Sequence, residues 1–143
     1  MTPLEKAAEI LQGIEVQAGV NGVTLPSLRY TQMAQPVIAC AGVIVAVTAT
    51  DPHPMYGPVE CNASQQVTFA VSIARDCSNV ANDDGTDNIV QLGKVSETMQ
   101  GDHDVLWDFA ACMEEYLSKQ WSLRMVITGG VAITSMTLTT GVD

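Results

Sequence analysis

The stretch that decides the fold is CNASQQVTFAVSIARDC, residues 61–77. Within it, every second residue from 67 to 73 is bulky and apolar: Val67, Phe69, Val71 and Ile73. The residues between and after them are small and neutral: Thr68, Ala70, Ser72 and Ala74. Because residues two apart share a face of a strand, this alternation predicts a strand over residues 66–75 whose bulky face packs against helices. The small face is expected to lie close to another sheet or another subunit.

A cysteine stands at each end of this stretch, which raises the question of a disulfide or a metal site. A strand between them spans roughly 50 Å at ~3.3 Å per residue, whereas a disulfide requires Cα atoms within about 7 Å. Cys61 and Cys77 are therefore not expected to bond to each other. Cys40 and Cys112 are predicted to be small core residues, and the chain has no C-x-x-C pair of the kind that zinc sites use. We expect free thiols throughout, as in a reducing cytoplasm.

The N-terminal segment is expected to form a helix. Thr2 is placed to cap it, Pro3 suits the first helical position, and Glu5 completes a capping box. The helix is predicted to fade before Gly19, and a short strand is predicted to follow over residues 28–33. Because the segment has acidic residues and no basic-then-apolar run, we do not expect a signal peptide.

Residues 37–50 are almost entirely apolar, which predicts a strand buried on both faces. Residues 51–60, DPHPMYGPVE, are rich in proline and predict a projecting loop. The long strands on either side of this loop are expected to form a hairpin centred near residue 55. Cys40 would then lie opposite residue 70, so a disulfide from Cys40 to the start of the second strand is not expected.

A helical segment in two parts is predicted after the polar residues 79–88. Residues 89–100 form the first part, and Gly101 interrupts it. Asp102 is placed to cap the second part, and Lys119 to lie near its negative end. The apolar face of the second part is expected to contain Val105, Leu106, Phe109, Cys112, Met113, Tyr116 and Leu117.

The C-terminal part of the chain predicts extended structure over residues 123–127 and 131–140. Gly129-Gly130 between them indicates either a hairpin turn or a bend in one long strand. The order helix, strands, helices, strands indicates an α+β fold, with an antiparallel or mixed β-sheet packed on one side by the N-terminal helix and the two-part helical segment. No linker or repeat interrupts residues 1–143, so a single domain is expected.

The charge balance argues against several classes of function. The chain has 16 acidic and 6 basic residues, a net charge of −10, and its basic residues are scattered, whereas phosphate binding needs clustered lysines and arginines. Charged residues make up only 15% of the chain, against ~25% in typical domains. Much of the surface is therefore neutral, which suits protein partners or self-assembly. No apolar run approaches the ~20 residues that span a bilayer.

Catalytic and cofactor motifs, such as G-x-S-x-G, the P-loop and the dinucleotide fingerprint, do not occur in the sequence, and we expect neither enzyme activity nor a cofactor. Four neighbouring residues have metal-binding side chains: Asp102, His103, Asp104 and Asp108. Helix capping and the helix dipole account for these acids, so no metal is expected. Residues 82–88, NDDGTDN, have the composition of a calcium loop but not the EF-hand spacing. A small monomeric ligand- or metal-binding module remains the alternative from a different class.

The sequence layout is an N-terminal helix, LPSLRYTQMAQPVIACAGVIVAV, a Pro-rich loop ending in Glu60-Cys61, QQVTFAVSIARDC, a polar loop, a helix with DVLWDFAACM, and the closing VITGGVAITSMTLTT. Over nearly the whole chain, this layout resembles the tail terminator proteins of long-tailed, siphovirus-type phages, especially those of actinobacterial hosts. Within the same class, the alternatives are another neck protein, such as a head completion or stopper protein, or a tail tube subunit.

The resemblance implies a structural protein that forms a ring, expected to be a hexamer. Such a ring caps the tail tube, fixes tail length and docks to the head–neck connector. The implied partners are further copies of the chain, the major tail tube protein and the connector, with no membrane. DNA would pass through the lumen without being bound specifically, since an acidic lining does not hold it back. The implied location is the tail or neck of the virion, after assembly in the host cytoplasm.

Candidate contact residues come from two loops, because projecting loops are where partners are commonly contacted. The tip of the Pro-rich loop offers Pro54, Met55, Tyr56 and Pro58. The polar loop offers three acidic residues: Asp83, Asp84 and Asp87. The alternative is that both are ordinary solvated loops.

Overall fold

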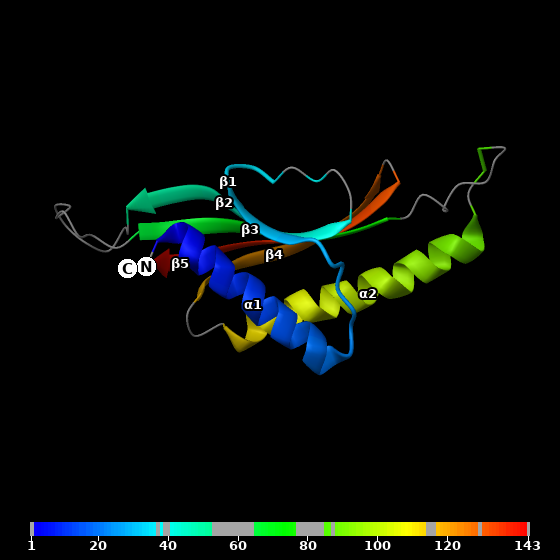
Figure 1. Cartoon of the computed structure of the whole chain (residues 1–143), viewed down its shortest axis with the longest axis horizontal. Coiled ribbons are helices and arrows are strands. Elements are labelled where there is room, and N and C mark those ends of the chain that lie inside the picture. The colour runs from blue at the N-terminus through cyan, green and yellow to red at the C-terminus, as the bar shows by residue number, and fades with distance from the viewer. Residues whose placement is uncertain are drawn as a thin grey trace.

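The computed structural model describes residues 2–36, 38, 41–52, 65–76, 85–86, 88–113, 117–128 and 130–142. In chain order its elements are α1 (Pro3–Asn21), β1 (Arg29–Met33), β2 (Gly42–Pro52), β3 (Gln65–Asp76), α2 (Ile89–Cys112), β4 (Leu117–Thr128) and β5 (Val131–Val142). Both helices lie on the same side of the sheet (Figure 1). This arrangement confirms the predicted α+β fold.

The described strands form a five-stranded sheet in the order β1-β2-β3-β5-β4. The sheet is mixed, because β1 runs parallel to β2 while the other neighbouring strands are antiparallel. β3 lies at its centre, and β1 and β4 are its edges. The two C-terminal segments form a β4–β5 hairpin rather than one bent strand. Gly130 at the turn has a φ of 77°, which glycine adopts without a steric penalty.

The alternation in β3 places its bulky side chains in the core, as predicted. All four of them are fully buried: Val67, Phe69, Val71 and Ile73. Neighbours on the adjacent strands continue this face: Val43, Val45, Val47, Met136 and Leu138. The helices cover it with large side chains that include Ile10, Ile14, Leu106 and Phe109. The core is therefore a layer between the sheet and the helix pair.

The β2–β3 register differs from the prediction. Val45 lies opposite Val71, whereas a hairpin centred near residue 55 would place it opposite Gln65. β2 also begins later than the predicted strand over residues 37–50. The observed register sets the valines of β2 beside the bulky residues of β3 on the helix side. A shift by one residue would move each of those side chains to the other face.

The helix α1 begins as predicted but ends later. The side chain of Thr2 accepts a hydrogen bond from the backbone nitrogen of Glu5 at 3.1 Å. The helix then continues through Gly19 and ends at Gly22, whose φ of 70° is left-handed. The prediction of an end before Gly19 was wrong. A glycine inside a helix costs only about 1 kcal/mol, and the burial of Ala18 in the core offsets that cost.

The helix α2 is continuous, so the prediction of two parts was wrong. Gly101 lies inside it, beside Val23, and a Cβ at Gly101 would meet only the Val23 side chain at 3.5 Å. The helix begins at the cap residue Asn88, whose side chain accepts from the backbone nitrogen of Gln91. Asp102 caps nothing and is buried in the middle of the helix. The acids at 102, 104 and 108 therefore lie far from the positive end of the helix dipole.

The predicted C-terminal part of this helix also needs correction. Cys112 is free and exposed rather than in the core, because the buried side of α2 runs through Phe109 and Ala110 and the helix ends just after it. Leu117 and Lys119, predicted to be helical, belong to β4. Tyr116, also predicted on this helix, lies outside the described residues. So do Cys40, Cys61 and Cys77, and their free thiols stay a prediction.

Candidate functional site

The seven contact residues predicted from the sequence lie outside the described residues: Pro54, Met55, Tyr56, Pro58, Asp83, Asp84 and Asp87. Their role as partner contacts therefore stays a prediction. The same holds for the polar segment 82–88 that was considered as a calcium loop. The described surfaces that remain are the two faces of the sheet, the helix surfaces and the edge strands.

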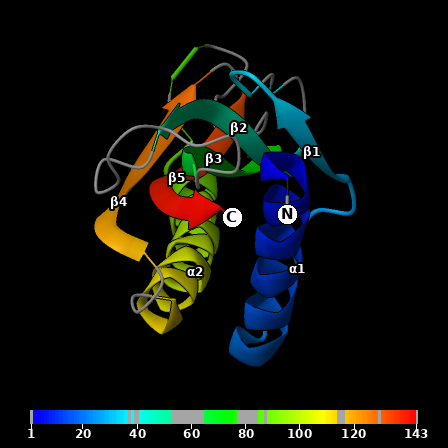
Figure 2. The ribbon, with the colours of Figure 1, turned by 90° about the vertical axis from the view of Figure 1, so that its left-hand side faces the viewer.

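The sheet face opposite the helices is neutral over much of its two central strands. By register, the charged residues on this side include Asp76 at the end of β3 and Arg124 of β4, which lies opposite Ser135. Toward the C-terminal end of β5 the face carries small neutral residues that are not buried: Thr68, Ala70, Ser135, Thr137 and Thr139. We call these five residues the open face. The hydroxyl groups of Thr68 and Thr139 lie 3.2 Å apart and link the two strands. Neither described helix lies over this side of the sheet (Figure 2).

The open face occupies one end of the sheet surface. Toward the other end, Ser72 and Ala74 are buried although they lie on the same side of β3. Thr137 is exposed, and its neighbours across the sheet are partly exposed. The part available for contact with another molecule therefore lies near the C-terminal end of β5.

Asp102 has a structural partner that accounts for its position. Its two carboxylate oxygens accept from Nε and Nη2 of Arg75, each at 2.7 Å. The Asp102 side chain is only 1% exposed, while that of Arg75 is 22% exposed. Arg75 also donates to the carbonyl oxygen of Thr24 at 2.8 Å. The pair thus joins the end of β3 to the middle of α2 and to the segment after α1.

The other members of the proposed acidic cluster point in different directions. Asp104 is exposed and accepts from Gln100 at 2.9 Å, and it lies 3.1 Å from Nδ1 of His103. The hydrogen bond with His103, followed by that with Gln100, lowers the pKa of the Asp104 carboxyl below its usual value. Asp108 instead accepts from Asn21 of α1 at 3.0 Å. Each acid has its own partner, and the described residues contain no group of three or more potential metal ligands.

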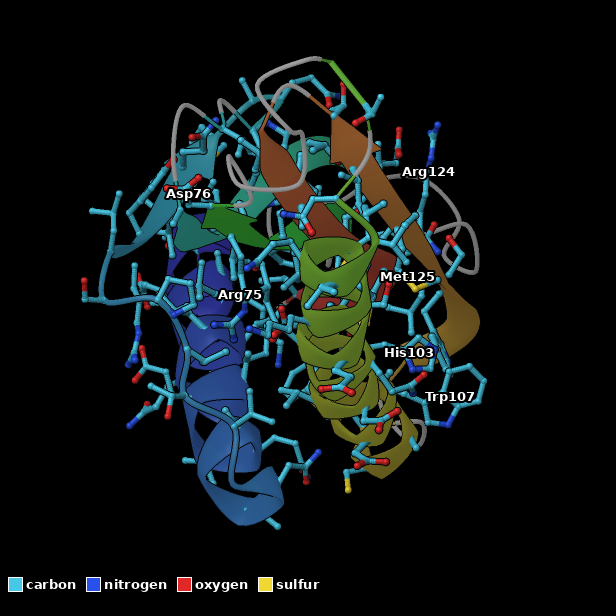
Figure 3. The ribbon with its side chains drawn as sticks, turned by 90° about the vertical axis from the view of Figure 1, so that its right-hand side faces the viewer. Arg75, Asp76, His103, Trp107, Arg124 and Met125 are labelled. Carbon is cyan, nitrogen blue, oxygen red and sulfur yellow. The ribbon has the colours of Figure 1, made fainter. Side chains whose placement is uncertain are left out.

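A small pocket lies where α2 passes the ends of β3 and β5, near Arg75 and Asp76 (Figure 3). Its lining also includes Lys94, Met99 and Ala132, and its volume is about 120 Å³. Pockets for organic ligands typically have volumes of roughly 300–1,000 Å³. The site is therefore too small for a ligand of that size.

An exposed apolar surface lies between α2 and the edge strand β4. Met125 and Ile127 face the helix side of the sheet by register, yet they are 50% and 40% exposed. Trp107 of α2 is 50% exposed and is drawn below Met125 in Figure 3. Its ring packs edge-on against Trp121, with centroids 4.8 Å apart, and stacks with His103 at 5.8 Å. We call Trp107, Met125 and Ile127 the flank patch.

Sequence reasoning missed the flank patch. Its residues are exposed because β5 pairs with β3 and leaves β4 at the edge, beyond the cover of the helices. The available signal was a run of apolar residues in β4 that alternates weakly, with Met125, Val126 and Ile127 in succession. Such a run is compatible with a strand whose two faces are both partly apolar.

Comparison with known proteins gave no match to any protein-family model. No curated protein sequence is significantly similar to the chain. Among the described residues, neither helix has the length and apolar character needed to cross a bilayer.

Proposed function

We propose that the chain is a structural virion protein of the tail terminator type. In this proposal, copies of the chain form a ring, expected to be a hexamer, that caps the tail tube, fixes tail length and docks to the head–neck connector. The observation that carries the proposal is the open face: a neutral sheet surface that neither described helix covers, on a chain with a net charge of −10.

The neutrality of the open face matters because the chain as a whole is acidic, with a net charge of −10. Like charges repel when copies of one protein approach, and the cores of protein interfaces are depleted of charged residues. The five residues of the open face carry hydroxyl and methyl groups only, and Arg124 lies beside them, opposite Ser135. Another protein surface that leaves Arg124 at its rim can cover these five residues without burying an unpaired charge. This supports the open face as the docking surface for the tail tube protein or the connector.

The layout adds support. A helix, a strand pair with a long intervening segment, a second long helix and a closing hairpin are the features on which the resemblance to tail terminators rests. The proposed role requires no catalysis and no cofactor. DNA would be a passing cargo, because a chain with a net charge of −10 and scattered basic residues does not favour phosphate binding. The proposed location is the tail or neck of the virion, after assembly in the host cytoplasm.

Deleting the gene from its phage tests the proposal against the other neck proteins. Loss of a terminator should give tails of uncontrolled length, measured by electron microscopy, and the wild-type gene should restore uniform tails. Loss of a head completion or stopper protein should instead give unattached tails of normal length. Normal tail length after deletion would overturn the proposal.

Point variants then test the open face. Thr137→Glu places a charge in its centre and should abolish complementation of the deletion. Ser96→Glu, at an exposed site on α2, is the matched control and should complement like the wild type. Circular dichroism must show that both variants are folded. Full complementation by folded Thr137→Glu would exclude the open face as the docking surface.

A further inference from the structure

We propose that the pocket between α2 and the ends of β3 and β5 binds a short aliphatic carboxylate. The lining of this pocket comes from all three elements, and it combines an apolar side with two cationic side chains. The same ligand chemistry occurs in a free short-chain acid and in the glutamate side chain of another protein. The inference goes beyond the proposed function, because capping a tail tube does not require such a ligand.

One side of the pocket is apolar. Val95, Met99 and Ala132 line it and pack together in a cluster that is separate from the main core. Met99 and Ala132 are buried, and Val95 is partly buried against them. An aliphatic chain placed on these side chains would remove apolar surface from water, which favours binding. A purely polar anion such as inorganic phosphate would not use this side of the pocket.

The polar side of the pocket carries two cationic side chains, Arg75 and Lys94. Arg75 lies on the helix side of the sheet (Figure 3) and donates from Nε and Nη2 to Asp102 and Thr24. Its Nη1 atom donates to none of the described residues. Lys94 is exposed on α2, and its ammonium group forms no ion pair within the described part of the chain. Both side chains therefore have donors left for a ligand.

The balance of charge around these donors selects an anion. Asp102 lies 2.7 Å from Arg75 and balances its charge. Lys94 has no such partner among the described residues, so the pair Arg75 and Lys94 retains one positive charge. A carboxylate bound between them would balance that charge and accept charge-assisted hydrogen bonds, which are stronger than bonds between neutral groups.

Asp76 is the acidic residue in the lining, and its position limits its effect on the ligand. Successive side chains of a strand point to opposite faces, so Asp76 leaves β3 on the side away from the helices, whereas Arg75 points toward them. Asp76 also has an interaction of its own, and it forms no ion pair with Lys94, which the structure likewise describes. The positive charge of Lys94 therefore remains available.

The size of the pocket limits the length of the ligand. Its volume is about 120 Å³, whereas a cavity of about 150 Å³ binds benzene. The pocket therefore has room for a group of about five heavy atoms. Propionate has this size, and so does the side chain of glutamate beyond its Cα. Longer acids would extend into solvent and gain little further burial.

Three small probes of similar shape and different charge test the pocket. Propionate should shift the methyl NMR signals of Val95, Met99 and Ala132 in a saturable way, with a dissociation constant on the order of 1–10 mM, as expected for so small a ligand. Neutral propionamide and cationic propylammonium should each bind at least about fivefold more weakly. No saturable shift with propionate would overturn the proposal. Equal binding of propionamide, or tighter binding of propylammonium, would also overturn it.

Two variants test the assigned side chains. Lys94→Met removes the charge but keeps a long side chain, and it should weaken propionate binding at least about fivefold. Val95→Phe should fill the pocket and abolish binding. Lys6→Met is the matched control and should bind like the wild type, because Lys6 lies on α1 and pairs with Glu9. Circular dichroism confirms that each variant is folded. Unchanged propionate binding by folded Lys94→Met would overturn the site.

A capped tripeptide with a central glutamate separates the two sources of the carboxylate. The matching peptide with a central glutamine is its neutral control. Binding of the glutamate peptide alone, with displacement by propionate, would identify the ligand as the side chain of another protein. Binding of propionate without binding of the glutamate peptide would identify it as a free short-chain acid. Failure of both ligands to bind would overturn the proposal, whatever the tail length of the deletion phage.

Discussion

Arg75 of β3 donates two hydrogen bonds of 2.7 Å to the buried carboxylate of Asp102 in α2. The two residues are 27 positions apart in the chain. A third bond, from Arg75 to the carbonyl of Thr24, brings in the segment after α1. One guanidinium group therefore joins the central strand, the long helix and the segment after the first helix. It also fixes the part of α2 that carries Trp107.

Replacing Arg75 by Met should lower the free energy of unfolding by about 3–5 kcal/mol, because the Asp102 carboxylate would stay buried without its partner. Urea denaturation measures the change. Lys6→Met is the control, since Lys6 pairs with Glu9 at the surface and such pairs contribute about 1 kcal/mol or less. The double variant Arg75→Met with Asp102→Leu should recover most of the stability. An Arg75→Met chain as stable as the control would contradict this account.

Asp102 also shows why the helical segment was predicted in two parts. A glycine followed by an aspartate is typical of a break and a new cap, and nothing near Asp102 in the sequence indicates a partner on β3. The alternation in β3 succeeded because a half-buried strand needs only local information. Continuity of α2 depends on a tertiary contact, which local patterns do not contain.

Predicting the candidate surfaces from the sequence would have required the strand order, to a greater extent than predicting the helices. The small side chains of Thr68 and Ala70 predicted a face for close approach, and the structure leaves that face uncovered by the described helices. The exposure of Met125 follows from the strand order β3-β5-β4, which places β4 at the edge. The spacing of apolar residues does not determine the strand order. The same β4 and β5 sequences, paired beside β2 instead of β3, would bury different side chains.

Gly13 should not tolerate a side chain, although it lies inside a helix. A Cβ there would lie 2.6 Å from Cε2 of Phe109, a core residue. Gly13→Ala should therefore destabilise the protein by about 1–3 kcal/mol through overpacking. Gly19→Ala, in the same helix with no atom within 4 Å of the added Cβ, should instead stabilise it by about 0.5–1 kcal/mol. Thermal unfolding of the two variants should give shifts of opposite sign, and equal shifts would refute the contact with Phe109.

Replacing Thr134 should stabilise the protein, because its buried hydroxyl group is unpaired among the described residues. Its side chain is fully buried on the helix side of β5, and its hydroxyl has no hydrogen-bond partner among the described residues. Thr134→Val removes this unpaired group at similar volume and should stabilise the protein by about 1 kcal/mol. Thr140, also buried on β5, does have an interaction partner. Thr140→Val should therefore be neutral or destabilising, and a stabilisation as large as that of Thr134→Val would contradict the distinction.

Asp104 should titrate below the ordinary carboxyl value of 3.8. The hydrogen bond from His103 is the larger cause and that from Gln100 the smaller, so His103→Ala should raise the pKa of Asp104 more than Gln100→Ala. Because the folded pKa is lowered, the stability that Asp104 contributes is present above the pKa of the unfolded carboxyl. It is lost as the pH falls through the folded value. The contribution is small, since the carboxylate is exposed to solvent. NMR titration of the side-chain carboxyl in the wild type and both variants measures the pKa directly. An unchanged pKa in His103→Ala would show that the 3.1 Å contact with His103 does not hold the charged form.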